Sequence, residues 1–309
     1  MKLYNDYNSY LKERYGSKVY KISVDAGFTC PNRDGTKGTG GCAYCNKDGS
    51  RAPHTSTLVV GVYPAIPVAE QLKSRIKYLK EKNGAAEKFI AYFQAFTNTY
   101  APVGRLKTIY DEVAPFKEII GISIGTRPDA VDEEKLGLVA SYGAKREVWI
   151  EYGLQSVHDR TLKSINRGHD FKDFLNAVNL TKKFDIQICV HVILGLPGET
   201  REDMIETARR LNELKVNGVK IHLLHILKGS AFEELYRKGL VKVLSQDEYV
   251  NLVSDFLENL SPDIIIQRLT GEGRRGDHIA PLWALDKIGT INKIREMLLT
   301  RKSFQGIRL

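Results

Sequence analysis

Short apolar segments alternate with amphipathic segments along most of this chain. The apolar segments are rich in Ile, Val, Phe and Tyr and have the lengths of buried β-strands. They span residues 19–24, 89–96, 119–124, 147–152, 186–194 and 219–227. Between them, apolar residues recur at helical spacing, which predicts helices over 68–82, 105–113, 133–141, 171–183 and 202–214. The pattern therefore predicts a series of strand–helix units.

Strands that alternate with helices form βαβ units on a parallel sheet. The six predicted strands are too few for a closed eight-stranded barrel. The pattern alone therefore fits two α/β folds, a partial (β/α)6 TIM-type barrel and a doubly wound sheet. Both bind their ligands beyond the carboxyl ends of the strands, so we expect the chemistry of this protein in the loops that follow the apolar segments.

The alternation weakens after residue 228. A helix is expected from about Ser245, where Glu248 three residues on completes a capping box, and a last helix is expected over 284–299. Thr200 and Asp203 resemble a capping box as well, although Glu or Gln is usual at the second position. We expect residues 1–240 to form a core domain and residues 241–309 to form a C-terminal helical extension packed on it.

Composition and charge narrow the class of protein. Of the 309 residues, 42% are hydrophobic and 27% are charged, which excludes a disordered or low-complexity chain. The 46 Lys and Arg residues exceed the 37 Asp and Glu residues, giving a net charge of +9 that favours an anionic partner such as nucleic acid. No targeting signal or membrane-spanning stretch is visible. We therefore expect a cytoplasmic protein with no membrane partner.

Three of the four cysteines lie in the loop directly after the first apolar segment. Cys30, Cys42 and Cys45 have the spacing C-x11-C-x2-C, and in a reducing cytosol such clusters are metal ligands or catalysts more often than disulfides. A structural zinc ion would need a fourth ligand, for which His54 and His278 are candidates. An iron–sulfur cluster held by three cysteines would instead leave one iron open. The spacing leaves both kinds of site open.

Other candidate residues carry weaker signals. Cys189, in the middle of an apolar segment, is expected to be a buried core thiol. His222 and His225 are three residues apart on the last predicted strand, which places them on opposite faces, one toward a cavity and the other in the core. The candidates for phosphate or carboxylate recognition are Lys228, Arg268, Arg274 and Arg275. A solvated basic loop is the alternative for these residues.

The cysteine loop, with Tyr44 before its last cysteine, resembles the radical S-adenosylmethionine (radical SAM) superfamily. The usual spacing there is C-x3-C-x2-C, and a wider first gap is a feature of the branch that resembles the Elongator catalytic subunit, which acts on the wobble uridine of tRNA. Similar motifs follow in the same order at residues 127–129, 151–156, 166–169 and 192–199. The segment 267–278 is similar to the small YhcC/YtqA-type subgroup. The resemblance favours the partial barrel over the doubly wound sheet.

The resemblance implies a [4Fe-4S] cluster on Cys30, Cys42 and Cys45, with S-adenosylmethionine bound at its open iron. Reduction of this cofactor by the cluster would give a 5′-deoxyadenosyl radical that abstracts a substrate hydrogen. The electron would come from a donor such as flavodoxin or ferredoxin.

The resemblance also implies a set of cofactor-binding residues: Tyr44, Gln94, Thr97, Arg127, Glu151, Gln155 and Gly195. The usual Gly-Gly-Glu after the second strand is absent, and Gln94 and Thr97 occupy its place. Tyr44 and Gly195 would lie against the adenine, while Arg127 would pair with the cofactor carboxylate. Alternatively, Glu151 forms a structural ion pair with Arg127 or Arg146.

We therefore expect an enzyme that modifies the C5 side chain of a tRNA wobble uridine, for example from carboxymethylaminomethyl toward aminomethyl. Two alternatives stay open. One is a radical SAM enzyme that acts on a small anionic metabolite such as a porphyrin precursor. The other is a zinc-stabilised RNA-binding module without catalytic activity.

Overall fold

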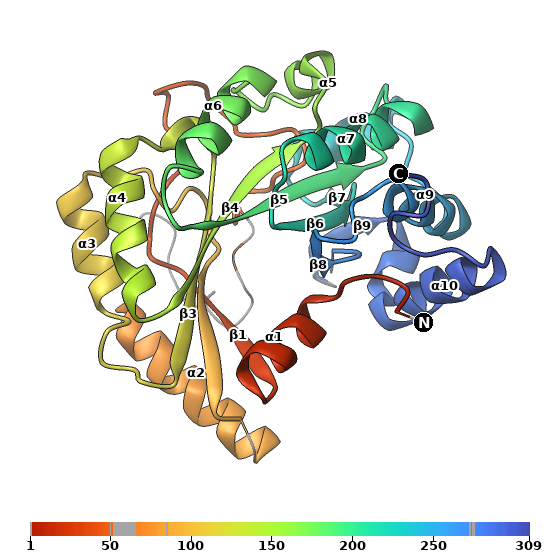
Figure 1. Ribbon diagram of the computed structural model, residues 1–309. Coiled ribbons are helices and arrows are strands. Elements are labelled where there is room, and N and C mark those ends of the chain that lie inside the picture. The colour runs from red at the N-terminus through yellow and green to blue at the C-terminus, as the bar shows by residue number, and fades with distance from the viewer. Residues whose placement is uncertain (1, 50, 52–65, 85, 272, 274–275) are drawn as a thin grey trace.

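A curved parallel sheet with helices along its outer side forms the body of the molecule (Figure 1). The computed structural model describes residues 2–49, 51, 66–84, 86–271, 273 and 276–309. The sheet has seven strands in the order β1-β2-β3-β4-β5-β6-β8. Their bounds are β1 Val19–Val24, β2 Lys88–Phe93, β3 Ile119–Thr126, β4 Glu147–Gln155, β5 Gln187–Leu194, β6 Gly218–Leu223 and β8 Ile265–Arg268.

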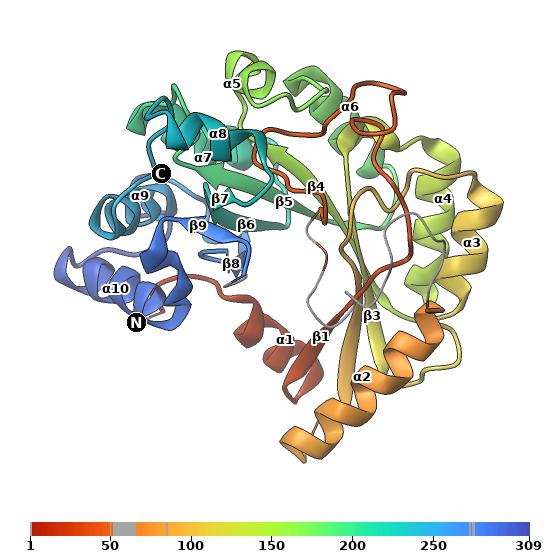
Figure 2. The same cartoon turned by 180° about the vertical axis from the view of Figure 1, so that it is seen from behind.

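Helices connect successive strands and cover the convex face of the sheet, as the view from behind also shows (Figure 2). Their bounds are α1 Tyr7–Tyr15, α2 Val68–Asn83, α3 Val103–Asp111, α4 Glu133–Ser141, α5 Asp159–Ser164, α6 Phe171–Thr181, α7 Arg201–Glu213, α8 Ala231–Arg237, α9 Gln246–Glu258 and α10 Lys287–Thr300. Short 3-10 turns among the described residues are η2 Pro128–Ala130, η3 Tyr142–Ala144 and η4 Leu282–Leu285. A second, antiparallel pair consists of β7 Ile226–Leu227 and β9 His278–Ala280.

The strands lie in the sheet in the order in which they occur along the chain, and every neighbouring pair is parallel. This arrangement confirms the partial barrel. The seventh strand, β8, adds to the six that the alternation predicts. It pairs with β6 through Gly218 and Ile265, and the sequence pattern missed it because only a short apolar run marks it.

Local signals set the helix boundaries as expected. Both predicted capping boxes are present, at Thr200 with Asp203 and at Ser245 with Glu248, and a third joins Asp170 and Asp173. In each one, the first side chain accepts a hydrogen bond from a backbone N–H that the helix leaves unpaired, and the second accepts one from the cap residue. An aspartate therefore serves at the second position as well as a glutamate does.

Helix α1 closes the amino-terminal end of the half-barrel. Tyr7 and Leu11, one helical turn apart, pack in a cluster with Trp149 of β4 and Ile265 of β8. The rings of Tyr7 and Trp149 meet edge to face with centroids 5.8 Å apart. Since α1 buries only these two side chains, it has no amphipathic pattern that sequence analysis could detect. Among the described residues, no helix is long and apolar enough to cross a membrane.

The C-terminal helices share their hydrophobic core with the sheet. Phe256 and Leu257 of α9 and Leu298 of α10 belong to the same buried cluster as Val219 of β6 and Ile266 of β8. Arg301, directly after α10, binds carboxylates of α9, donating to Asp255 at 2.9 Å and to Glu258 at 3.1 Å. We therefore infer that the C-terminal segment unfolds together with the barrel.

Phe256→Ala is expected to lower the free energy of unfolding by about 3–5 kcal/mol, because a fully buried ring would leave a cavity. Ile288→Ala, at an exposed side chain of α10, is the matched control and should change it by less than about 0.5 kcal/mol. Urea denaturation followed by circular dichroism measures both. An early separate transition of the C-terminal helices in Phe256→Ala would contradict the shared core.

Candidate active site

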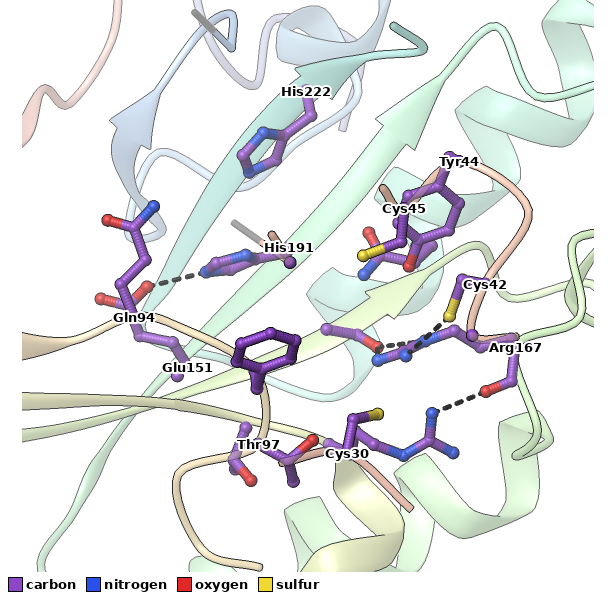
Figure 3. Close-up of a pocket in the computed structure, with 18 of the residues that line it drawn as sticks. Cys30, Cys42, Tyr44, Cys45, Gln94, Thr97, Glu151, Arg167, His191 and His222 are labelled. Atoms are coloured by element: carbon purple, nitrogen blue, oxygen red, sulfur yellow. Dashed lines mark hydrogen bonds and ion pairs between the residues drawn. The ribbon is translucent and has the colours of Figure 1, made fainter. Parts of the chain in front are cut away.

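The three clustered cysteines line one cavity of about 160 Å³ at the carboxyl ends of the strands. Figure 3 shows the sulfur atoms of Cys30, Cys42 and Cys45 facing the same space. A single turn brings two of them together, since the backbone N–H of Cys45 donates to the carbonyl of Cys42 at 2.9 Å. Gly41 precedes this turn with φ +80°, and a Cβ there would lie 2.9 Å from Arg33 Nε, so a side chain would not fit.

The segment after α5 holds the cysteine loop in place. Asn32 Nδ2 donates to the carbonyl of Asn166 at 2.6 Å, and Asn166 Nδ2 donates back to the carbonyl of Gly41 at 2.8 Å. The backbone of Ala43 adds a hydrogen bond to the carbonyl of Ile165 at 2.9 Å. These bonds join parts of the chain that are far apart in sequence, so they fix the loop independently of any bound group.

Arg167 is a candidate site residue that sequence analysis missed. Its Nη1 lies 3.4 Å from Cys42 Sγ, and its Nε donates to the carbonyl of Gly153 at 3.1 Å. Burial raises the pKa of the Cys42 thiol, but Arg167 and then Arg127 outweigh this effect and hold the pKa below its ordinary value. The sequence offered one indication of its role, since Arg167 lies in the motif at residues 166–169 that resembles the radical SAM branch.

The spacing of the cysteines fits a cluster better than a single zinc ion. Two sulfur ligands of one zinc, each about 2.3 Å from it, are at most about 4.6 Å apart. Among the described His, Cys, Asp and Glu side chains, only Glu151, Cys189 and His191 bring three ligand atoms within 4.8 Å of one another, and the three loop cysteines do not. Separate irons for separate sulfurs fit this wider arrangement.

Of the two candidates for a fourth zinc ligand, the structure describes only His278, which does not complete the cysteine site. His54 lies outside the described residues. His278 Nε2 lies 2.7 Å from the carbonyl of Pro281, and its ring stands against His225 with centroids 4.9 Å apart. Neither of these histidines is among the described residues that line the cysteine cavity.

Glu151 lies in the wall of the cysteine cavity, with its carboxylate fully engaged. Lys21 Nζ is 2.8 Å from Oε1, His191 Nε2 is 2.7 Å from Oε2, and Lys220 and Ser123 contact the same two oxygens. Burial raises the pKa of this carboxyl, yet the two lysines outweigh it and hold the pKa well below its ordinary value. Because both oxygens already bind ammonium groups, the nearby Cys189 and His191 do not make this cluster a metal site.

The alternative ion pair predicted for Glu151 is wrong in its partners. Arg127 binds Asp129 through Nε at 2.8 Å and Nη2 at 2.9 Å, and its Nη1 donates to the carbonyl of Arg167 at 2.7 Å. Arg146 donates to backbone carbonyls, including that of Ile119 at 3.0 Å. Lysines on neighbouring strands are therefore the counterions of Glu151. Arg127, whose expected partner was the cofactor carboxylate, already holds an internal carboxylate.

Most of the residues implied as cofactor contacts come together around the cysteines. Those that line the same cavity are Tyr44, Gln94, Thr97, Arg127, Glu151 and Gln155. The hydroxyl of Thr97 is buried without a hydrogen-bond partner in the described structure. Gly195 is not among the lining residues. Its φ is +85° and a Cβ there would lie 3.0 Å from Leu244 Cδ1, so packing and backbone conformation explain this glycine.

A second cavity, of about 520 Å³, adjoins the first. The residues shared by the two walls are Tyr44, Cys45, Gly49, Gln94, Gln155, His191, His222 and Arg268. Beyond this shared wall the second cavity is lined partly by aliphatic side chains, among them Ile193, Leu223 and Leu227. A molecule in the second cavity would therefore be close to one bound beside the cysteines.

The expectation that His222 and His225 point to opposite faces is wrong, since both line the second cavity. Strand β6 ends at Leu223, so the alternation of a strand does not extend to His225. Neither is a satisfied core residue, because Nε2 of each is buried without a partner among the described atoms. Burial lowers the pKa of His225 to about 4 and that of His222 well below its ordinary value, so both rings are neutral at pH 7.

The remaining basic candidates do not lie together at one site. Arg268 lines both cavities, whereas Lys228 is exposed, with its backbone N–H on the carbonyl of Asp277 at 2.7 Å. Arg274 and Arg275 lie outside the described residues. His191 also lines both cavities, and its ring lies 5.3 Å from that of His222. Sequence analysis missed His191 because it stands inside an apolar segment.

Comparison with known proteins also supports an iron–sulfur site, rather than a zinc site, at the three cysteines. The chain is 42% identical over 308 residues to the protein YtqA of Bacillus subtilis, covering 99% of this chain and 92% of that protein. It is 27% identical over 138 residues to a tRNA uridine(34) acetyltransferase of Methanocaldococcus infernus, covering 44% of this chain and 25% of that protein. The solved structure of M. infernus Elp3 with an N-terminal deletion has the same fold, with a TM-score of 0.67 at 17% identity, covering 93% of this chain and 64% of that one.

Two family descriptions match this sequence. Residues 216–299 match the Radical_SAM C-terminal domain. Residues 33–211 match the Radical SAM superfamily, a range that includes Cys42 and Cys45 and begins just after Cys30. Because this second match runs from the cysteine loop through α7, over more than half of the chain, the protein belongs to the radical SAM superfamily.

Proposed function

We propose that this chain binds a [4Fe-4S] cluster and S-adenosylmethionine and uses them to modify the C5 side chain of a tRNA wobble uridine. The observation that carries the proposal is a cavity lined by three cysteines that adjoins a larger cavity across a shared wall. Cys30, Cys42 and Cys45 would each bind one iron. When bound, the cluster and S-adenosylmethionine supply a 5′-deoxyadenosyl radical that abstracts a hydrogen atom.

The chain's own residues prepare this site in three ways. Arg167 places a cation and an N–H donor beside Cys42 Sγ, which favours the thiolate that binds iron. Tyr44, Gln94 and Gln155 stand in the wall between the cavities, where they would contact S-adenosylmethionine on one side and the substrate on the other. The buried hydroxyl of Thr97 has no partner among described residues and is available to the cofactor.

The support for a tRNA substrate comes from relatives and from charge. A relative that matches part of this chain is named for its action on tRNA uridine 34, and the net charge of +9 favours a polyanionic partner. The match covers only 25% of that relative, so we do not extend its acetyltransferase reaction to this chain.

The specific reaction we propose converts carboxymethylaminomethyluridine to aminomethyluridine. The methylene carbon beside the carboxylate loses one hydrogen atom to the adenosyl radical, then one electron and one proton, which leaves a carbon–nitrogen double bond. Water adds to that bond and releases glyoxylate and the amine. A one-electron carrier such as flavodoxin or ferredoxin supplies the starting electron and accepts the later one.

The cysteine assignment predicts the metal content of the protein. The full chain, reconstituted without oxygen, should be brown, hold about four irons and release 5′-deoxyadenosine when dithionite is added. Cys30→Ala, Cys42→Ala and Cys45→Ala should each lose the cluster and this release, because each removes an iron ligand. Cys189→Ala, at the buried core thiol, is the matched control and should retain both. A colourless protein with one zinc would contradict the assignment.

The substrate assignment predicts a change in one tRNA nucleoside. When tRNA from cells that lack the gene is treated with reconstituted enzyme, S-adenosylmethionine and reductant, mass spectrometry should show carboxymethylaminomethyluridine falling and aminomethyluridine rising. The same mixture without S-adenosylmethionine is the control. Binding of tRNA should weaken steeply as salt rises, because phosphate contacts release counterions. Unchanged uridine nucleosides, with 5′-deoxyadenosine still formed, would exclude this substrate and favour a small anionic metabolite.

Arg167 is expected to tune the cluster. Arg167→Met removes the cation and the N–H donor beside Cys42 Sγ, and hydrogen bonds and positive charge at cluster sulfurs stabilise the reduced state. The midpoint potential, followed by electron paramagnetic resonance, should therefore become more negative in Arg167→Met and shift less in Arg167→Lys. Arg160→Met, at an exposed arginine of α5 that pairs with Asp203, is the control. Equal potentials in all four proteins would show that Arg167 only shapes the loop.

A further inference from the structure

Arg268 ends strand β8 and stands where the two cavities meet. Its backbone pairs with Lys220 of β6 in the sheet, and its side chain lines both the cysteine cavity and the larger second cavity. In the part of the chain that the structure describes, its guanidinium has no hydrogen-bond or ion-pair partner. A partly buried arginine without a counterion is costly, because its charge loses hydration without compensation.

The other cations around these cavities differ from Arg268 in this respect. Lys21 and Lys220 both bind the carboxylate of Glu151, and Arg127 binds that of Asp129. Arg167 donates to the carbonyl of Gly153 and to Cys42 Sγ. These cations bind groups of the protein itself, whereas the guanidinium of Arg268 faces the second cavity.

The histidines beside Arg268 complete a site for an anion. His222 and His225 line the same cavity, and each has a buried Nε2 without a partner among the described atoms. A neutral imidazole can donate one hydrogen bond to an anion. Gly271 leaves this corner open, since a Cβ there would lie 3.5 Å from His222 Nδ1 and 3.3 Å from His225 Cε1.

The shape of the site favours a single carboxylate. One guanidinium offers two parallel N–H groups in a plane, which match the two oxygens of a carboxylate. The aliphatic side chains of Ile193, Leu223 and Leu227 lie on the same wall and suit the uncharged part of such a ligand.

We propose that Arg268, together with His222 and His225, binds the carboxylate of the substrate's C5 side chain in the second cavity. This inference rests on the proposed function, in which the carboxylate ends the side chain that is removed. Binding it at the junction of the cavities places the adjacent methylene, from which hydrogen is taken, toward the cysteine cavity. Loss of the carboxylate from the nucleoside would also weaken binding of the product.

S-adenosylmethionine carries a carboxylate too, and Arg268 borders its expected cavity as well. The test therefore separates the two sources. Two anticodon stem-loop RNAs are compared, one with carboxymethylaminomethyluridine and one with the corresponding amide, which has the same shape without the charge. Their dissociation constants are measured with reconstituted full chain and S-adenosylmethionine, without reductant. The proteins are the wild type, Arg268→Gln, Arg268→Lys and Arg237→Gln, the last at an exposed arginine of α8 outside both cavities.

The wild type and Arg237→Gln should bind the acid at least about tenfold more tightly than the amide, as expected for hydrogen bonds to a charged group. Arg268→Gln should lose this preference, and Arg268→Lys should recover part of it through charge alone. A preference kept in Arg268→Gln, or absent from the wild type, overturns the inference. So does a weaker affinity for S-adenosylmethionine in Arg268→Gln with the RNA preference intact. Absence of conversion of the acid RNA by the wild type, with its binding preference present, would refute the proposed reaction alone.

Discussion

A buried carboxylate holds the interior of this half-barrel together. Glu151 of β4 receives Lys21 from β1, Ser123 from β3, His191 from β5 and Lys220 from β6, so five strands direct polar side chains to one point. Leaving a buried charge unpaired costs several kcal/mol, so removal of any one of these partners would be costly. Lys21 Nζ also donates to Gln267 Oε1 of β8 at 3.3 Å, which links the two edge strands across the concave face. The curl of the sheet brings these two edge strands within hydrogen-bonding distance.

The position of the Glu151 network also explains how the site above it is organised. Both lysines bind Glu151. Burial lowers the pKa of His191 to about 4, although its contact with Glu151 raises it, so this ring is neutral at pH 7. A hydrogen bond joins the His191 ring to Glu151 on one side, and the His222 ring lies on the other, tilted by 34° with centroids 5.3 Å apart. The network thus forms a polar floor beneath the site, in which each charged side chain already has a partner within the protein. The charge that acts on a bound molecule must therefore come from side chains of the cavity wall outside this network.

The parts of the fold that sequence analysis predicted are those set by neighbours along the chain. Strand β1 and helix α4 have the bounds that the pattern predicts, and the caps at Thr200 and Ser245 depend only on residues three positions away. The cysteine loop was recognisable for the same reason, since its spacing lies within one segment. The β8 strand was not, because pairing with β6 rather than its own short apolar run makes it a strand.

The site residues that were missed depend on contacts between distant segments. Arg167 reaches Cys42 only because Asn32 and Asn166 join two loops, and no pattern within either loop reports that contact. His225 departs from the face expected of it because β6 ends two residues earlier, a boundary that depends on the sheet. Residue type and spacing therefore identify what can bind a metal, while the environment of those ligands depends on the assembled barrel.

The C-terminal segment has a chemical as well as a structural role in this arrangement. The cysteines lie in the loop after β1 and Arg268 ends β8, the last strand of the parallel sheet along the chain, yet both border the same cavity. Helix α9 helps to hold strand β8 in this position, with Tyr249 Oη donating to the carbonyl of Leu269 at 2.8 Å just beyond the strand. A change in the packing of α9 would therefore move Arg268 relative to the cysteines. Under the proposed role of Arg268, substrate specificity and core stability would be linked at this strand, because the sheet, helix α1 and helix α9 that position Arg268 also belong to the buried core.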